Sequence, residues 1–218
     1  IAVSKCTIAK VSEFKGLNSV SAPNVMWGAE IISDQSGMYA GLFTHMDADA
    51  DKYGAKARKQ INKDLYGKMG TEDERLVWWN PKDANNKDGG YQQEKFKFSD
   101  IQTWMGDYVW MRIEEMYLIA AEAECRLGHD AGAREYLMDL MSKRDASYSC
   151  AQKSGTSMGK LTSDYTGSLL EEIIIQRRIE LWGEFGRIYD IRRLKQGFKR
   201  TAEMGWPTDA WLVNRNAN

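Results

Sequence analysis

The acidic and histidine residues are the first candidates for chemistry in this chain of 218 residues, and their pattern does not indicate a catalytic site. Hydrolysis of a glycosidic bond requires two carboxylates, one of them with a raised pKa. The 31 Asp and Glu residues could supply such a pair by number alone, so the count indicates nothing. The two histidines, His45 and His129, do not lie close in the sequence to a plausible nucleophile motif. We therefore predict no catalytic residue and no enzymatic activity.

The segment from Asp47 to Asp51 has the Asp-x-Asp-x-Asp pattern that opens a calcium-binding loop. An EF-hand loop also requires Gly at its sixth position and Glu at its twelfth, where this chain has Lys52 and Arg58. An EF-hand is thereby rejected. A solvated acidic turn is favoured over a looser calcium site.

Cysteine spacing and overall charge exclude further classes of site. Cys6, Cys125 and Cys150 are far apart and include no Cys-x-x-Cys pair, so we expect no metal site and no disulfide framework, although a single bridge stays open. The 30 Lys and Arg residues balance the 31 acids to a net charge of −1, which gives no reason to expect a nucleic-acid partner. We predict neither a metal nor a cofactor.

Positive charge is nevertheless concentrated between residues 177 and 200. Eight Lys or Arg residues accompany only three acids there, Glu180, Glu184 and Asp190, which is an excess of five positive charges. Two interpretations stay open, a face that binds an anionic ligand and a helix surface on which acids and arginines pair. The spacing of the three acids favours the ion pairs.

The first half of the chain has the patterns of short strands and loops. Val25 to Ile32 has the length and β-branched content of a buried strand. Residues 75–79 and 91–98 are further strand candidates, on either side of a surface loop at 81–90. Residues 55–65 have the composition of a short helix.

From Tyr108 onward the apolar spacing becomes helical. Residues 111–127 and 131–144 each carry an apolar stripe, and Gly128 supplies a turn between them. This pattern predicts an antiparallel helix hairpin of the tetratricopeptide-like kind. We therefore predict a mostly α fold, with tetratricopeptide-like helical hairpins, long irregular loops and a few short strands.

Two more helices are expected near the carboxy terminus. Ser168 to Glu171 has the pattern of a capping box, which opens a helix that reaches Trp182. Residues 187–194 form the next helix. We expect Trp182 and Tyr189 to be mostly buried at the corner between these helices.

The segment from Arg177 to Arg193 is the most specific motif in the chain. It closely resembles the signature of the SusD/RagB family of outer-membrane glycan-binding lipoproteins. The order Phe185-Gly186 departs from the family pattern, in which the Gly usually comes first. Weaker motifs precede it in the family's order. Residues 111–123 are similar to an R-x-x-E-x-Y-L-x-x-A-E-A helix, residues 73–75 to a D-x-R turn, and residues 24–27 to an E-V-I-W strand.

The resemblance implies an organisation for the chain. Residues 1–218 are expected to be one fragment, the carboxy-terminal part of a SusD-like domain, because the family's lipidated cysteine and helical first half are not in this sequence. A loop- and strand-rich part spans 1–107 and a helical part spans 108–200. The charged signature residues are expected to be structural rather than ligand-binding, and they are Arg178, Glu180, Glu184, Arg187, Asp190 and Arg193.

Glycan binding, which the family implies, requires exposed rings for sugar C–H faces and polar groups for hydroxyls. The loop-rich region from Ser33 to Asn80 offers such groups, although each of them taken singly fits a scaffold role better. The predicted contacts are Tyr39, Phe43, Asp47, Tyr53, Trp78 and Asn80. The eight Trp and ten Tyr of the chain provide wide apolar area for such contacts, and helical packing is the competing explanation.

The family resemblance also implies a function and a place in the cell. A neutral or weakly acidic oligosaccharide and a TonB-dependent, SusC-like transporter would be the partners, at the outer-membrane surface, with a lipid anchor outside this fragment. The alternative is a helical-repeat adaptor that binds another protein. Glycan binding predicts exposed aromatic residues in loops of the first hundred residues, whereas an adaptor predicts them on the helices between 110 and 145.

Overall fold

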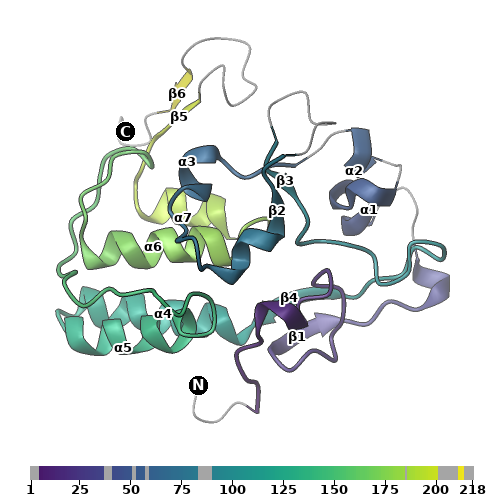
Figure 1. The fold of residues 1–218 in the computed structure, drawn as a ribbon, viewed down its shortest axis with the longest axis horizontal. Helices are drawn as coiled ribbons and strands as arrows, with labels where there is room; N and C mark the ends of the chain where they lie inside the picture. Colours follow the sequence, from purple (N-terminus) through teal and green to yellow (C-terminus); the bar gives the residue numbers. More distant parts are fainter. Residues whose placement is uncertain are drawn as a thin grey trace. The chain divides into compact units, whose positions relative to one another are not determined.

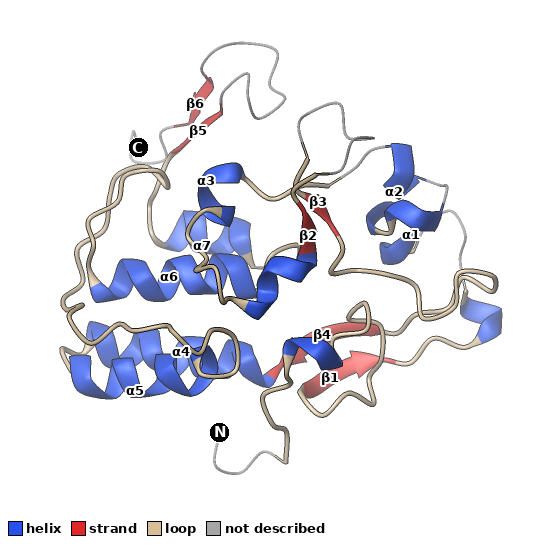
Figure 2. Cartoon of the chain, viewed as in Figure 1, coloured by secondary structure: helices blue, strands red, loops and turns tan. Residues whose placement is uncertain are grey.

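The structure is a computed structural model that describes residues 5–36, 41–50, 53–56, 59–82, 90–184, 186–200 and 211–213. The chain divides into two compact units. The first unit comprises residues 1–116 and 140–148, and the second comprises 117–139 and 149–218. Helices dominate the described part of the chain, where strands form three two-stranded sheets (Figures 1 and 2). The predicted mostly α fold with a few short strands is thereby confirmed.

The first unit contains an antiparallel pair of strands, β1 (Val25–Ala29) and β4 (Tyr108–Arg112). The pairing is irregular on either side of Trp27, which marks a bulge in β1. Gly28 is required there, because a Cβ at this position would lie 2.5 Å from the carbonyl oxygen of Tyr108. The predicted strand at 25–32 therefore exists, but it is shorter than expected and none of its residues is fully buried.

Short elements occupy the rest of the first unit. The α-helices are α1 (Leu42–Met46), α2 (Tyr53–Lys56) and α3 (Lys63–Tyr66), and the 3-10 helices are η1 (Val11–Glu13), η2 (Ser33–Gln35), η3 (Ala48–Ala50) and η4 (Glu74–Trp78). The predicted strand at 75–79 is instead mainly η4, because the Asp73 side chain accepts a hydrogen bond from the Arg75 amide and starts a helical turn. The strands in this region are β2 (Trp79–Asn80) and β3 (Gln92–Gln93), which have only two residues each and pair antiparallel.

The predicted helix hairpin is confirmed. Helix α4 (Ile113–Arg126) continues directly from β4, and α5 (Asp130–Met141) follows after a turn. Gly128 occupies the left-handed region at φ 83°, and the His129 amide donates to the Glu124 carbonyl oxygen at 2.9 Å. Tyr117 on α4 and Tyr136 on α5 meet edge to face with ring centroids 6.4 Å apart. The two helices lie side by side in Figure 1.

Helix α6 (Leu169–Glu180) is the most buried element of the second unit. Arg178 is its one residue that is not fully buried. The Ser168 hydroxyl accepts from the Glu171 amide at 3.1 Å, as the sequence predicted. In a capping box the Glu171 carboxylate would also accept a hydrogen bond from the Ser168 amide. Here it accepts instead from the amides of Thr166 and Gly167.

Helix α7 (Arg187–Arg193) follows, and β5 (Phe198–Arg200) pairs antiparallel with β6 (Trp211–Val213). The expected burial of Tyr189 is wrong, since its side chain is 66% exposed, and Trp182 is only partly buried. The reason is the chemistry of α7. Its buried residue is Asp190, which is held by ion pairs, whereas Ile188 and Tyr189 remain exposed.

No helix within the described ranges is both long enough and apolar enough to cross a membrane.

Candidate functional site

Two tryptophans on the β1–β4 pair form the clearest exposed aromatic surface of the first unit. Trp27 is 58% exposed and Trp110 is 41% exposed. Their ring centroids lie 4.7 Å apart at an interplanar angle of 64°, an edge-to-face contact. The bulge at Trp27 breaks the regular alternation of β1 and leaves Met26 and Trp27, which are consecutive residues, both exposed.

This geometry determines how the pair can bind a ligand. Rings at 4.7 Å already touch, so nothing can enter between them. A ligand must instead lie on the outward face of a ring, and Trp27 offers more accessible area than Trp110. An apolar face with few directional groups suits a flat molecule that also carries polar edges, as a sugar ring does.

A second exposed pair joins α1 to α2. The rings of His45 and Tyr53 stack almost parallel, with centroids 5.1 Å apart and an angle of 10°. Both side chains are exposed. Tyr53 is one of the six contacts predicted from the sequence, and its accessible ring can meet a ligand.

Phe43 and Trp78, also predicted as contacts, lie in the interior. Phe43 is 2% exposed and packs against Phe98 and Tyr108, at centroid distances of 5.6 and 6.3 Å. Trp78 is equally enclosed, and its ring lies 5.0 Å from that of Phe14. Neither ring presents a face that a sugar could reach in this conformation.

The polar predictions divide in the same way. Asp47 is buried, and its carboxylate accepts hydrogen bonds from the amides of Asp49 and Phe98, each at 2.9 Å, so it organises the local backbone. Asn80 is exposed, and its side chain accepts from the Lys82 amide at 3.0 Å. Tyr39 lies outside the described residues.

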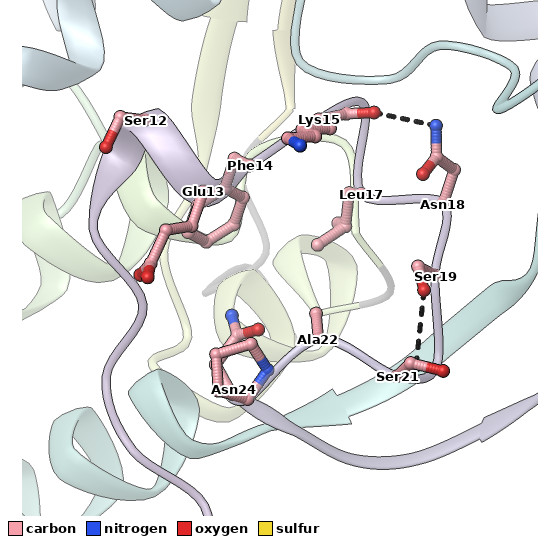
Figure 3. Close-up of a pocket in the computed structure, with 11 residues that line it drawn as sticks. Ser12, Glu13, Phe14, Lys15, Leu17, Asn18, Ser19, Ser21, Ala22 and Asn24 are labelled. Carbon is pink, nitrogen blue, oxygen red and sulfur yellow. Dashed lines mark hydrogen bonds between the residues drawn. The ribbon is translucent and has the colours of Figure 1, made fainter.

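A pocket of about 380 Å³ lies within the first unit, lined by 11 residues of the segment 12–24, all except Gly16 and Val20 (Figure 3). Phe14 belongs to its wall, and the guanidinium groups of Arg112 and Arg144 lie 5.3 and 5.5 Å from the centre of its ring. Such cation–π contacts fix the ring in place. Sequence reasoning missed this pocket because the segment shows only weak periodicity.

A buried carboxylate organises the charges around Phe14. Glu114 is fully buried and forms ion pairs with Arg112 at 3.1 Å and with Arg144 at 3.2 Å. It also accepts hydrogen bonds from the Asn24 side chain and from the Ala9 amide. Three groups distant in sequence and the neighbouring Arg112 therefore converge on one side chain, which makes Glu114 a structural anchor.

The family-like signature forms a comparable network in the second unit. Asp190 on α7 pairs with Arg177 on α6 at 3.0 Å and with Arg193 at 2.8 Å. Arg193 also donates through both terminal nitrogens to Glu122 on α4, one of these bonds measuring 2.7 Å. Three helices are thus joined by one chain of ion pairs.

Burial dominates the electrostatics of the other signature arginines. It lowers the pKa of Arg178 below its usual value, and burial together with the charge of Arg178 lowers the pKa of Arg187 to about 10. Among the described residues, the buried Nη1 of Arg187 has no hydrogen-bond partner. Glu180 is completely buried and Glu184 is partly buried.

The structure gives no support for catalysis. Residues 155–159 have the letters Gly-x-Ser-x-Gly, but they lie in an irregular loop rather than in the strand–turn–helix that a nucleophile elbow needs. His129 is exposed and its Nδ1 lies 2.8 Å from Glu124. Within the described ranges no three His, Cys, Asp or Glu side chains are placed to hold a metal ion.

Three solved structures with a similar fold are SusD-like or SusD superfamily proteins. A SusD-like carbohydrate-binding protein from Bacteroides vulgatus is 25% identical, with a TM-score of 0.66 over 95% of this chain and 43% of its own. A SusD superfamily protein from the same organism is 20% identical, with a TM-score of 0.71 over 98% of this chain and 46% of its own. A SusD superfamily protein from Bacteroides thetaiotaomicron is 19% identical, with a TM-score of 0.62 over 91% of this chain and 44% of its own.

The chain thus spans less than half the length of these structures. A comparison with curated protein sequences found no match. Residues 39–217 match the SusD family, which binds glycans without catalysis, in agreement with the expectation that the chain is not an enzyme. This match covers most of the sequence and includes the charged network of α6 and α7, so the chain belongs to the SusD family.

Proposed function

We propose that the protein is a carbohydrate-binding protein whose ligand is a neutral or weakly acidic oligosaccharide. The family match supports this proposal, as does the similarity to a SusD-like carbohydrate-binding protein. The exposed Trp27–Trp110 pair is the observation in this chain that carries it. Exposed tryptophan is costly in water, and an apolar surface of this kind marks a contact site.

Within the six contacts predicted from the sequence, we assign ligand contact to Tyr53 and Asn80, whose side chains are exposed. Phe43, Asp47 and Trp78 receive a scaffold role because they are buried. Trp27 and Trp110 are added to the contact residues. Trp27 was not among the six because it lies in a segment with the composition of a buried strand.

The cellular role follows from the family. We place the longer protein at the outer surface of the outer membrane, held by a lipid anchor outside this fragment, where it delivers the bound glycan to a SusC-like, TonB-dependent transporter. The resemblance of the signature to outer-membrane glycan-binding lipoproteins supports this assignment.

The distribution of exposed rings favours this proposal over a protein-binding adaptor. Trp27 and Tyr53 are exposed within the first hundred residues. Trp110 falls at the start of the range expected for an adaptor, but it lies on strand β4. Helices α4 and α5 carry Tyr117 and Tyr136, which pack on each other and are only partly accessible.

Isothermal titration of the full-length protein tests the proposal. The ligands are maltohexaose, cellohexaose, xylohexaose and mannohexaose. We expect binding of at least one of them, and loss of most of that binding in a Trp27→Ala, Trp110→Ala double variant. Tyr189→Ala is the matched control, since Tyr189 is an exposed ring on α7 and belongs to the family signature. Equal loss in the control, or retained binding in the double variant, would refute the assignment.

A further inference from the structure

The pocket formed by residues 12–24 has walls of mixed character. The ring of Phe14 and the side chains of Leu17 and Ala22 provide apolar surface, and in Figure 3 the last two point toward each other across the loop. The Ser19 hydroxyl accepts from the Ser21 amide at 3.2 Å and keeps its own proton to donate. Pockets of roughly 300–1,000 Å³ with a few polar groups on apolar walls are typical of small-ligand sites.

The pocket is held open by one bond within its own loop and by bonds to other parts of the first unit. The Asn18 side chain donates to the carbonyl oxygen of Lys15 within the loop at 2.7 Å and to that of Lys97 at 2.9 Å. The Val20 amide donates to the Asp107 carboxylate at 2.9 Å. A loop fixed at several points loses little conformational freedom when a ligand binds, so the pocket is preorganised.

Backbone conformation adds a second indication. Leu17 has a φ of +50°, in the left-handed region that leucine seldom adopts. The preceding Gly16 has a φ of +101°, where a side chain would be strained. Backbone strain of this kind is concentrated at ligand sites, where the surrounding structure maintains it. Here it directs the buried Leu17 into the pocket wall.

The pocket is continuous in sequence with the tryptophan pair. Asn24 lines the pocket, and Trp27 follows three residues later within β1. Three residues of extended strand span about 10 Å. One oligosaccharide chain is long enough to reach both places.

We propose that the pocket of residues 12–24 is a second sugar subsite, which holds one sugar residue of the oligosaccharide that stacks on Trp27. This inference rests on the proposed carbohydrate binding and adds a place where the protein selects a particular sugar unit. The bound unit would lie against the apolar side chains of Leu17 and Ala22 and receive a hydrogen bond from Ser19. The neighbouring residues of the same glycan would lie on the exposed tryptophan.

The test fills the pocket and leaves Trp27 unchanged. Ala22→Leu in the full-length protein should lower the affinity for the best-binding hexasaccharide by about tenfold. Ala22→Ser adds one polar atom and should change the affinity by less than about twofold. In the wild type, shorter oligomers of the same sugar should bind more weakly once they cannot occupy both places. Ala22→Leu should remove this dependence on length, whereas Trp27→Ala should weaken binding at every length.

The thermal midpoint of each variant is recorded in parallel. Unchanged affinity of a folded Ala22→Leu variant would overturn the subsite while leaving the proposed function intact. If that variant does not fold, Ser19→Ala tests the subsite instead. It should lower the affinity by about threefold to tenfold, because one hydrogen bond to the sugar is missing. An unchanged affinity of Ser19→Ala would overturn the subsite. A wild-type protein that binds none of the four hexasaccharides would overturn both proposals.

Discussion

Single side chains in this protein differ in whether they face solvent or the interior, and Trp27 is the clearest exposed ring of the first unit, at 58% exposure. The Trp27 ring contacts the Trp110 ring edge to face, so Trp110 supports the Trp27 ring from one side. We expect Trp27→Ala to weaken oligosaccharide binding by about 0.5 to 1.5 kcal/mol, the scale of one aromatic contact. Trp110→Ala should cost less, because Trp110 is less exposed.

Isothermal titration of both single variants measures this asymmetry. Trp27→Tyr is the control, since it keeps a ring and should retain most of the affinity. A larger loss for Trp110→Ala than for Trp27→Ala would contradict the assigned roles. Neither change should lower the free energy of unfolding by more than about 1 kcal/mol, as is usual for exposed positions.

Glu114 is the opposite kind of residue, since it is buried between two arginines. Glu114→Gln removes the charge and leaves the guanidinium groups of Arg112 and Arg144 enclosed beside a neutral group. Breaking a buried ion pair from one side costs about 3 to 5 kcal/mol. The urea midpoint of unfolding measures the change, and Glu135→Gln on the exposed side of α5 is the control. A midpoint equal to that of the control would show that Glu114 is not an anchor.

Residue types alone could not separate these two kinds of position. Phe43 and Trp78 have the chemistry of sugar-binding residues, yet both are enclosed by other rings. Trp27 lies in a segment with the composition of a buried strand, and its exposure depends on a bulge that pairs it irregularly with β4. Burial is decided by long-range pairing, which a single sequence does not contain.

At the scale of elements, the charged signature joins α4, α6 and α7. Burial alone would raise the pKa of Glu122, but hydrogen bonds from Arg193 and Arg126 outweigh it and hold the pKa below its ordinary value of 4.5. The Glu122 hydrogen bond in turn raises the pKa of Arg193. The proton is therefore bound more weakly to Glu122 in the folded state than in the unfolded state.

A carboxylate whose pKa is lower in the folded state stabilises the fold at pH values above its pKa in the unfolded state. This contribution disappears as the pH falls through the pKa of the folded state. We expect Glu122→Gln to lower the free energy of unfolding at pH 7 by about 1 to 2 kcal/mol, since Arg193 is partly exposed and solvent screens the pair. The difference from the wild type should shrink below pH 4.5. Urea unfolding at several pH values measures it, and a difference independent of pH would contradict the role of the charge.

Elements with long periodic patterns were predictable, and short ones were not. Residues 113–126 and 130–141 are helical as their apolar stripes indicate, because each helix satisfies its own backbone hydrogen bonds. Residues 75–79 have β-branched and aromatic content, but all except Trp79 belong to the 3-10 helix η4, since the Asp73 side chain caps it. Local capping outweighs strand propensity over so few residues.

At the scale of the whole molecule, charge balance and family membership point to the same kind of ligand. The net charge of −1 provides no general attraction for a polyanion. In the signature, Arg177 forms an ion pair with Asp190 and Arg193 forms one with Glu122. Binding should then depend on ring stacking and on hydrogen bonds to hydroxyl groups. Both act at short range.

This distinction predicts how binding responds to salt. Raising the ionic strength from about 0.01 M to about 1 M shortens the screening length from about 30 Å to about 3 Å. The affinity of the full-length protein for a neutral hexasaccharide should change by less than about threefold over this range, since no charge on the ligand is screened. Isothermal titration at several salt concentrations measures it, and chromatography of the same mixtures should show the sugar uncleaved. A steep loss of affinity with salt would instead indicate a charged ligand, and released shorter sugars would indicate an enzyme, so either outcome would exclude a neutral, non-catalytic binding protein.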